Sequence, residues 1–409
     1  MTAIPEIDLS NPAALRDPFT AYGRAREICP LARLVTPGFG TMWAVTRYEH
    51  AKAMLTDPRF ELNANSYLRP DVPEHCLKYM RTMQEMDGPE HTRLRRLVSP
   101  SFSARRAAEF RPRVMRIVEG MLDDLAEKAE RAEPAGGGNG NAVDLLDHFA
   151  RPLPIEVICE LVGIPPEDRG SWRTYGAAVT AGHGPAFARA IPAIMRDAVA
   201  AVARRTHEPG ADLLSELVGV HADDQDRLGD TELVTLVWHL ILAGQTPANL
   251  VANAVETLLG HPGQLAALRA DEDLMPGAVE ELTRWYGPQL LTLPRYARED
   301  ADIAGFPIGK GEPVTVALAA ANRDPRVFAD PDRFDLRRPA GKPAHLGYAH
   351  GPHFCLGAAL ARVQTEAALT GLLRRFPDLA FAGDGAQRAP DPGTWRLTAL
   401  PVSLCPVSL

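Results

Sequence analysis

The stretch GYAHGPHFCLGAALAR, residues 347–362, places one cysteine between a loop rich in glycine and histidine and an apolar run typical of a helix. A thiolate acts as a nucleophile or as a metal ligand, and a helix N-terminus stabilises it because the first backbone N–H groups lack helical partners. Gly351 and Gly357 allow the backbone to approach a flat partner closely. His353 lies two residues before Cys355 and can face the same partner. Residue types and spacing therefore point to thiolate chemistry at Cys355.

Cys355 taken by itself admits other interpretations. A single cysteine at the start of a helix is most often a small buried side chain. A zinc site built from Cys355, His353 and His350 would have too short a spacing, and no second cluster of ligands follows. A catalytic thiol requires histidine and asparagine partners, and the sequence offers no convincing pair. The residues around the cysteine decide between these possibilities.

The pattern around Cys355 resembles the cysteine loop of the cytochrome P-450 haem-thiolate monooxygenases, whose signature is Phe-Gly-x-Gly-x-His-x-Cys-x-Gly followed by a helix. The chain matches this signature at Gly351, His353, Cys355 and Gly357. It departs at Tyr348, one aromatic residue for another, and at Ala349, a small residue in place of glycine. The resemblance covers about residues 17–400. It implies that the thiolate of Cys355 is the proximal ligand of the iron of haem b, with Phe354 beside it in the loop.

The resemblance also implies which residues bind the two haem propionates. In similar proteins these groups are held at positions that match His91, Arg95 and Arg295, together with His353 of the loop. His91 and Arg95 lie four residues apart in MDGPEHTRLRRLV and share a helix face, whereas Arg295 lies on an expected strand. Carboxylates at a haem edge require N–H donors, and arginine presents a bidentate fork. A solvated arginine is the ordinary alternative at each position.

The segment EELTR places Glu281 and Arg284 three residues apart on one helix face, where they can pair. Alone, such a pair is most often an exposed contact of little energetic value. The family has a Glu-x-x-Arg motif at this distance before the cysteine, completed by an arginine in Pro-x-x-Phe-Asp-x-x-Arg. The matching segment DPDRFDLRRP gives Arg338, with its neighbour Arg337 as an alternative. The resemblance implies a structural network that holds the cysteine side of the protein for haem loading.

An apolar helix is interrupted in LILAGQTPANLVANAV, residues 240–255, where a proline costs about 3 kcal/mol. The family pattern here is Ala-Gly-x-acid-Thr, in which the glycine opens an oxygen pocket above the iron and the acid–alcohol pair relays protons. Counting from the helix start places Thr246 in the acid position and Pro247 in the threonine position. Counting back from LLGHP places Gln245 and Thr246 there instead. Either way the carboxylate is absent, and an amide holds water but does not titrate. The resemblance implies that the catalytic residues on the oxygen side are Ala243, Gly244, Gln245 and Thr246.

Helical patterns dominate the elements that must position these residues. DTELVTLVWHLILAGQTPANLVANAVETLLG predicts a long helix from Asp230, its expected N-cap, to Gly260. MPGAVEELTRWYGP predicts a second helix. A third follows the cysteine, with an apolar face made of Leu356, Leu360, Val363 and Ala367.

A smaller β portion is expected near residues 30–60 and 288–320, where alternation and turn residues predict short strands. The glycine-rich segment 133–143 lacks the residues of a phosphate-binding loop and predicts a surface loop. No repeat or linker divides the chain, so residues 1–409 are expected to form a single cytochrome P-450 domain, mainly α with a minor β region. The resemblance places the haem between the long central helix and the helix that follows the cysteine.

Composition excludes several classes of protein. The 409 residues carry a formal net charge of −8, which argues against a nucleic-acid partner. Five scattered cysteines do not form a disulfide framework and favour a reducing cytoplasm. No apolar run is long enough for a membrane span, and the N-terminal residues do not match a secretory signal. A cytoplasmic monomer without nucleic-acid or membrane partners is expected.

The reaction that the resemblance implies is insertion of one oxygen atom of O₂, by hydroxylation or epoxidation, into a medium or large apolar molecule. A polyketide, a macrolide or a steroid-like compound would suit. Electrons would come from NAD(P)H through a ferredoxin and a ferredoxin reductase. Arg105, Arg106 and Arg362 are candidates for the docking patch, and a solvated surface is the alternative. Two other functions stay open: oxidative coupling, cyclisation or peroxide-driven chemistry, which loss of the acid would suit, and a haem sensor without turnover.

The family layout places the substrate pocket along residues 63–83, 177–187, 289–293 and 394–395, together with the long helix. His239 on that helix is a candidate to face the pocket, and a buried core histidine is the alternative.

Overall fold

Two groups of elements, one built around a mixed β-sheet and one almost entirely helical, make up the computed structural model of the chain. It describes residues 3–36, 40–67, 70–131, 142–180, 184–223, 228–341 and 343–404. The first unit, here named the sheet unit, contains Met1–Tyr67, Ala252–Cys355 and Ala386–Thr398. The second, the helical unit, contains Leu68–Val251, Leu356–Gly385 and Ala399–Leu409. Each unit has its own buried apolar cluster, and the single domain expected from the sequence stays a prediction.

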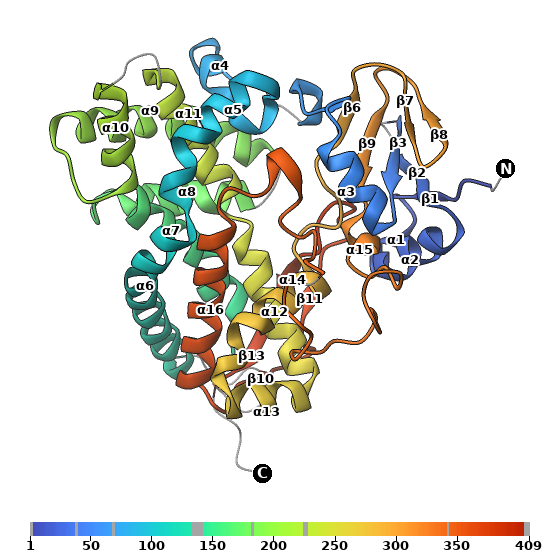
Figure 1. Cartoon of the computed structure of the whole chain (residues 1–409). Helices are drawn as coiled ribbons and strands as arrows, with labels where there is room; N and C mark the ends of the chain where they lie inside the picture. The colour runs from blue at the N-terminus through green and yellow to red at the C-terminus, as the bar shows by residue number, and fades with distance from the viewer. Residues whose placement is uncertain are drawn as a thin grey trace. The chain divides into compact units, whose positions relative to one another are not determined.

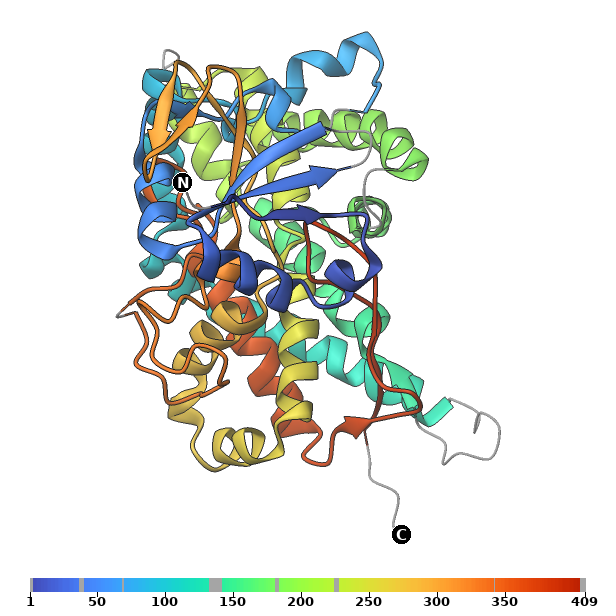
Figure 2. The same cartoon turned by 90° about the vertical axis from the view of Figure 1, so that its right-hand side faces the viewer.

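A six-stranded sheet of order β1-β2-β3-β9-β6-β4 organises the sheet unit. Its strands are β1 (Glu6–Asp8), β2 (Leu31–Thr36), β3 (Gly40–Val45), β4 (Phe60–Glu61), β6 (Arg295–Ala297) and β9 (Pro313–Val316). In the antiparallel pair β2–β3, buried Leu31 lies opposite buried Val45. The exposed Arg33 lies opposite Trp43, with its guanidinium 5.6 Å from the ring centre. The parallel pair β3–β9 then joins the N-terminal strands to the later ones, and Figure 2 shows β1, β2 and β3 as neighbours.

Helices complete the sheet unit, and side chains cap some of them at their first turn. They are α1 (Pro12–Arg16), α2 (Pro18–Ile28), α3 (Tyr48–Thr56), η1 (Ala64–Ser66), α13 (Pro262–Ala270), η5 (Glu272–Leu274), α14 (Met275–Tyr286), α15 (Leu318–Ala321) and η6 (Gly351–His353). Asp17 caps α2 by accepting a hydrogen bond from the Thr20 N–H at 3.1 Å, and Pro18 occupies the first turn. Tyr22 of α2 packs in one cluster with Leu34 of β2. The second helix expected from the sequence, within MPGAVEELTRWYGP, is α14.

Helices make up nearly all of the helical unit. They are α4 (Glu74–Met80), η2 (Met83–Glu85), α5 (Gly88–Val98), η3 (Ser99–Phe102), α6 (Ala104–Arg131), η4 (Leu146–Ala150), α7 (Pro152–Val162), α8 (Arg169–Thr180), α9 (Pro185–His207), α10 (Leu213–Asp223), α11 (Asp230–Ala243) and α16 (Ala358–Arg375). Figure 1 shows α6 and α16 side by side. A Cβ at Gly371 of α16 would lie 2.7 Å from Val118 Cγ1 of α6, so a glycine permits this close packing.

The buried face of α16 differs from the expected one. Of the expected face, Ala367 is fully buried, whereas Leu356, Leu360 and Val363 are only partly buried. Thr365 and Leu369, which were not expected on that face, are fully buried. The expectation counted apolar residues alone. The packing against α6 also buries small and polar side chains of α16. The buried Thr365 hydroxyl has a hydrogen-bond partner, because it donates to Ala361 O at 2.8 Å.

The long helix expected over residues 230–260 is two helices, α11 and α12 (Pro247–Gly260), and α12 crosses the boundary between the units. The expected N-cap is also off by one residue. Asp230 is the first helical residue, and Gly229 is the cap, whose N–H donates to Glu232 Oε2 at 2.8 Å. Glycine has no side chain with which to cap the helix, so the carboxylate of Glu232, three residues later, accepts a hydrogen bond from the cap backbone instead.

Small sheets account for the remaining strands. They are β5 (Ala142–Asp144) with β13 (Pro401–Ser403) and β10 (Ala380–Phe381), β7 (Ala301–Ile303) with β8 (Phe306–Ile308), and β11 (Gln387–Arg388) with β12 (Leu397–Ala399). Most of the expected surface loop 133–143 lies outside the described residues. Among the residues that are described, no helix has the length and apolar content required to cross a bilayer.

Candidate functional site

The cysteine loop, residues 347–357, is fixed by its own backbone and by contact with α3. The Cys355 N–H donates to Tyr348 O at 2.9 Å, which closes the loop. Gly351 has a φ of +76°, and a Cβ there would lie 2.8 Å from Thr56 Cγ2. Only glycine satisfies both the left-handed backbone and this close approach. The loop conformation therefore depends on the glycine of the sequence motif.

Cys355 is exposed, whereas the other described cysteines are buried: Cys29, Cys76 and Cys159. Burial raises the pKa of the Cys159 thiol to about 12, so that this sulfur stays protonated. Within the described residues, no group of three or more His, Cys, Asp or Glu side chains is placed to hold a metal ion. An accessible thiol such as that of Cys355 suits a metal whose other ligands come largely with the cofactor, as in haem iron.

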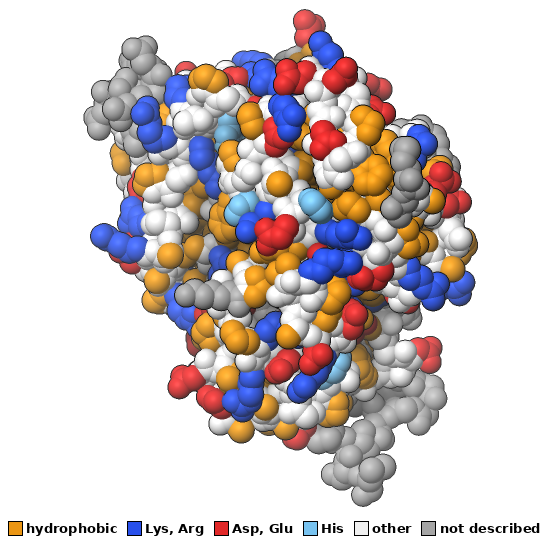
Figure 3. Space-filling view, turned by 45° about the vertical axis from the view of Figure 1, so that its right-hand side comes forward, with side chains coloured by type: hydrophobic (Ala, Val, Ile, Leu, Met, Phe, Trp, Pro, Cys, Tyr) orange, Lys and Arg blue, Asp and Glu red, His pale blue; other side chains and the backbone are white. Residues whose placement is uncertain are grey.

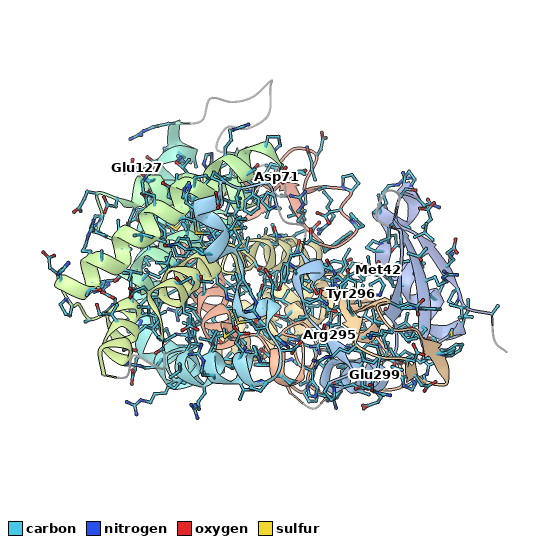
Figure 4. The ribbon with its side chains drawn as sticks, turned by 90° about the horizontal axis from the view of Figure 1, so that it is seen from above. Met42, Asp71, Glu127, Arg295, Tyr296 and Glu299 are labelled. Atoms are coloured by element: carbon cyan, nitrogen blue, oxygen red, sulfur yellow. The ribbon has the colours of Figure 1, made fainter. Side chains whose placement is uncertain are left out.

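Arg295 and the cysteine loop both lie against the C-terminal end of α3. It is buried on β6, and its Nη1 donates to Leu55 O at 3.0 Å. The same carbonyl would lie 3.0 Å from a Cβ at Gly351. The sheet unit thus brings Arg295, the C-terminal end of α3 and the cysteine loop together, and Figure 4 shows Arg295 next to Tyr296 on β6. His353 ends the short helix η6 within the loop.

His91 and Arg95 lie on one face of α5 in the helical unit, with His91 buried and Arg95 partly buried. Burial, and then the positive charge of Arg95, lowers the pKa of His239 on α11 to about 4. His239 is therefore a buried, neutral histidine near Arg95. Since Arg295 and His353 belong to the sheet unit, a shared haem edge formed by all four expected residues stays a prediction.

Glu281 is the centre of a buried network on α14. Arg284 donates from Nε and Nη2 to the two carboxylate oxygens, at 2.7 and 2.8 Å. Arg338 Nε adds a bond at 3.0 Å, and the Asp335 N–H adds one at 3.1 Å. The Glu281 and Arg284 side chains are each 2% exposed, so their pairing is not an ordinary surface contact. Arg338 occupies this network, and Arg337 is exposed.

The break between α11 and α12 has a local cause. Pro247 has no N–H to donate to Ala243 O, and the Thr246 hydroxyl donates to that carbonyl instead, at 3.0 Å. A Cβ at Gly244 would lie 2.4 Å from Leu240 O and 2.5 Å from Ile158 Cδ1. Glycine and proline therefore shape the break together.

Gln245 sits in this break with an unusual environment. It is 5% exposed, and neither its amide oxygen nor its amide nitrogen has a hydrogen-bond partner among the described residues. Its Oε1 lies 3.4 Å from the position of a Cβ at Gly176 on α8. The Thr246 hydroxyl turns to Ala243, so within the described chain Gln245 and Thr246 do not form a hydrogen-bonded pair. The role of Gly176 could not be predicted from the sequence, because a single glycine within a helix forms no pattern.

Two segments expected to line the substrate pocket meet within the sheet unit. The Leu290 N–H donates to Gly393 O, and the Trp395 N–H donates to Pro288 O, both at 2.9 Å. Leu293 nearby is 38% exposed, a large apolar side chain open to solvent.

Two other expected segments belong mainly to the helical unit. Within residues 63–83, α4 packs against α9 and α11. Residues 181–183 of the segment 177–187 lie outside the described residues. At its end, the Phe187 ring of α9 stacks on Trp238 of α11 at 6.1 Å.

The expected docking arginines carry compensated charges. Arg105 Nε donates to Glu109 Oε1 at 2.9 Å, and Arg106 Nη1 donates to Glu109 Oε2 at 3.2 Å. Arg106 also pairs with Glu216. On the face drawn in Figure 3, acidic and basic side chains are interspersed rather than gathered by sign. A docking patch that includes Arg362 stays a prediction.

A mainly helical fold with an accessible thiol in a glycine-shaped loop is typical of haem-thiolate proteins. The cytochrome P450 family model matches residues 193–393. The chain is 40% identical over 390 residues to cytochrome P450 monooxygenase PikC of Streptomyces venezuelae, covering 94% of this chain and 91% of the relative. It is 37% identical over 416 residues to 6-deoxyerythronolide B hydroxylase of Saccharopolyspora erythraea, covering 98% and 97%. The ligand-free structure of P450 monooxygenase TamI matches with a TM-score of 0.86 and 34% identity, covering 98% of this chain and 95% of that one.

The chain therefore belongs to the cytochrome P450 family. It is a P450 monooxygenase, an oxidoreductase, and the family implies haem as its cofactor. The mainly helical fold with minor sheets is confirmed. These findings count against the haem sensor without turnover.

Proposed function

We propose that the chain inserts one oxygen atom of O₂, by hydroxylation or epoxidation, into a medium or large apolar substrate of the macrolide or polyketide type. The observation that carries this proposal is the exposed thiol of Cys355 in a loop closed by its own N–H. The substrate class is supported by a relative that is named for hydroxylation of 6-deoxyerythronolide B.

The Cys355 thiolate would hold the iron of haem b. When bound, a haem with a cysteine ligand supplies O₂ activation for oxygen insertion. Arg295, His353, His91 and Arg95 would donate to its carboxylates, and the buried guanidinium of Arg295 is already oriented by its bond to α3. In the balanced reaction, substrate C–H, O₂, NAD(P)H and one proton give the alcohol, water and NAD(P)⁺.

On the oxygen side, we assign Ala243, Gly244, Gln245 and Thr246 to water and proton handling. The Thr246 hydroxyl donates to Ala243 O, so its oxygen still accepts a hydrogen bond from water. Gln245 can donate from Nε2 and accept at Oε1, which orders a water without carrying a proton. Protons would therefore pass along water molecules rather than through a side-chain carboxylate.

Electrons from NAD(P)H would arrive through a separate ferredoxin and its ferredoxin reductase. The compensated charges of Arg105 and Arg106 leave only a modest field for an acidic donor. Docking would then depend on salt concentration less than a strongly basic patch would.

The central test compares Cys355→Ala with Cys29→Ala, a cysteine that is buried and outside the loop. Both proteins are purified with haem, reduced and exposed to carbon monoxide. We expect the thiolate-type absorption band from the wild type and from Cys29→Ala, and its loss from Cys355→Ala. Persistence of the band in Cys355→Ala would exclude this cysteine as the ligand.

The substrate class is tested by titrating macrolides, polyketides and unrelated apolar compounds against the oxidised protein and following the haem spectrum. Compounds that bind are then incubated with NAD(P)H, ferredoxin and reductase under isotopically heavy O₂. A product that gains one heavy oxygen atom supports the proposal. Conversion without any oxygen gain contradicts oxygen insertion for that substrate.

A second candidate, oxidative coupling or cyclisation, including peroxide-driven chemistry, is favoured by Gln245, because an amide cannot deliver protons as a carboxylate does. Peroxide carries both oxygen and electrons, so it removes the need for such delivery. Product formation with hydrogen peroxide alone, equal to that with NAD(P)H and its redox proteins, would favour this candidate. Absence of any product with peroxide, together with a heavy oxygen atom in the product formed from O₂, would favour oxygen insertion.

A further inference from the structure

His345 lies two residues before the cysteine loop, and its side chain is only 5% exposed. Its Nδ1 accepts a hydrogen bond from the Gly347 N–H at 3.0 Å, so in the neutral ring the proton is on Nε2. That Nε2 lies 3.3 Å from Glu280 Oε2 on α14. The ring therefore lies between α14 and the backbone of the loop: Nδ1 is hydrogen-bonded to the loop, whereas Nε2 lies close to the Glu280 carboxylate without a hydrogen bond to a described residue.

The start of the loop is packed so closely against this ring that only glycine fits. A Cβ at Gly347 would lie 3.0 Å from His345 Nδ1 and 2.7 Å from Thr283 Cγ2 of α14. A histidine that merely filled space would not require such an approach. The hydrogen bond and the contact with α14 together hold residue 347 in place.

His345 also touches the residue that closes the loop. Its ring centre lies 5.5 Å from that of Tyr348, at an angle of 46° between the rings. Tyr348 O accepts the hydrogen bond from the Cys355 N–H. The next residue, Ala349, has a φ of +59°, a left-handed conformation that is unfavourable for a residue with a Cβ atom. The loop therefore requires external support to keep this strained turn.

α14 supplies that support through two successive carboxylates. Glu281 is held by the arginine network, as described above, which fixes the helix against residues 331–338. Its neighbour Glu280 faces His345. One imidazole thus lies between the start of the loop and the helix that carries the Glu281 network.

We propose that His345 is a positioning residue for the haem–thiolate bond: it holds Gly347 and Tyr348 in the strained turn that presents Cys355. The proposal rests on the proposed function of Cys355 as the iron ligand. Glu280 sets the tautomer of the ring, because its carboxylate favours a proton on Nε2 and leaves Nδ1 free to accept from Gly347. Loss of the Nδ1 acceptor lets the turn at Ala349 relax and weakens the hold on the thiolate.

The test uses variants that separate the two nitrogens. His345→Leu removes both, His345→Asn keeps an acceptor near the position of Nδ1, and His345→Gln places its amide near that of Nε2. The readout is the rate at which the thiolate-type band of the reduced carbon monoxide complex disappears in mild urea, together with the reduction potential. We expect His345→Leu and His345→Gln to lose the band about tenfold faster, and His345→Asn to stay close to wild type. Glu280→Gln should fall between these.

His261→Leu provides a matched control, because His261 is another histidine of the sheet unit that bonds locally, through Nδ1 to Thr257 O at 2.7 Å. This variant should lower the unfolding midpoint without accelerating band loss at urea concentrations where the protein stays folded. Wild-type band-loss rate and potential in His345→Leu would overturn the proposal. If His345→Leu fails to fold, equal rates for the Asn and Gln variants overturn it instead. Absence of the band from the wild type would contradict the proposed function rather than this role.

Discussion

Two buried polar side chains, Glu281 in the sheet unit and Gln245 in the helical unit, have opposite surroundings. Glu281 accepts hydrogen bonds from Arg284, Arg338 and the Asp335 backbone. Gln245 has no partner for either amide atom among the described residues. A fully bonded buried group makes a structure rigid, whereas an unbonded one costs about 1–3 kcal/mol unless water satisfies it. The hydrogen bonds around α14 thus hold that region in one conformation. The helix break, in contrast, has an amide that can still donate and accept hydrogen bonds.

The largest expected effect comes from breaking the bonded region. Glu281→Ala leaves Arg284 as a buried charge with its carboxylate removed, which destabilises a protein by about 3–5 kcal/mol. We expect a large fall in the free energy of unfolding in urea and little haem in the purified protein. Arg337→Ala is the matched control, because Arg337 is exposed beside Arg338 and should change stability very little. Similar stability of the two variants would show that the network is not the support described here.

The second effect is a pH dependence located in the helical unit. His239 has a folded pKa of about 4 against 6.5 in the unfolded chain, so the unfolded state binds the proton more readily between these values. Its contribution to stability is complete above pH 6.5 and is lost as the pH falls through this window, and the loss reaches about 3 kcal/mol below pH 4. The sign is that of a histidine buried in its neutral form.

The measurement is the difference in free energy of unfolding between wild type and His239→Phe, followed from pH 7 to pH 4. The carboxylates titrate in both proteins, so their contributions to the pH dependence cancel in this difference. The difference should shift in favour of the Phe variant as the solution becomes more acidic. A difference that is independent of pH would mean that His239 is already solvated or protonated at neutral pH.

Local patterns predicted much of the fold and of the sheet-unit site. The helix at 275–286 follows from Pro276 in its first turn and Gly287 after its end, and the cysteine motif follows from its glycines. The choice between Arg337 and Arg338, and the burial of Glu281, depended on how residues 331–338 pack against α14. Sequence spacing does not contain that packing.

The helix break was only half predictable. Gly244 and Pro247 predicted an interruption of the long helix, because both residue types destabilise a helix interior by known amounts. The partners of Thr246 and Gln245 did not follow, because they depend on a carbonyl freed by Pro247 and on Gly176 of α8. The same limit applies to α16, whose buried face includes Thr365 because α6 packs there.

A third, smaller effect concerns the shape of the break itself. Gly244→Ala would force a Cβ against Leu240 O and Ile158 Cδ1, and overpacking of this kind costs about 1–3 kcal/mol. Gly260→Ala is the control, because nothing lies within 4 Å of a Cβ at the end of α12, and alanine favours a helix. We expect a lower melting temperature for the first variant and an equal or higher one for the second. Equal melting temperatures would mean that the break adapts easily and does not require glycine.

The smallest effect on stability, and the one that separates the two regions most clearly, is expected at Gln245. Gln245→Leu removes two unpartnered polar atoms from a buried site, so the free energy of unfolding should stay the same or rise by about 1 kcal/mol. A polar group whose loss does not destabilise the fold is present for another reason, and water handling in turnover is the role proposed for it. We therefore expect Gln245→Leu to consume more NAD(P)H per product formed, and Gln245→Glu to restore the coupling, since a carboxylate can both hold water and carry a proton. A marked loss of stability in Gln245→Leu, with coupling unchanged, would instead place Gln245 with Glu281 among the side chains that hold the structure together.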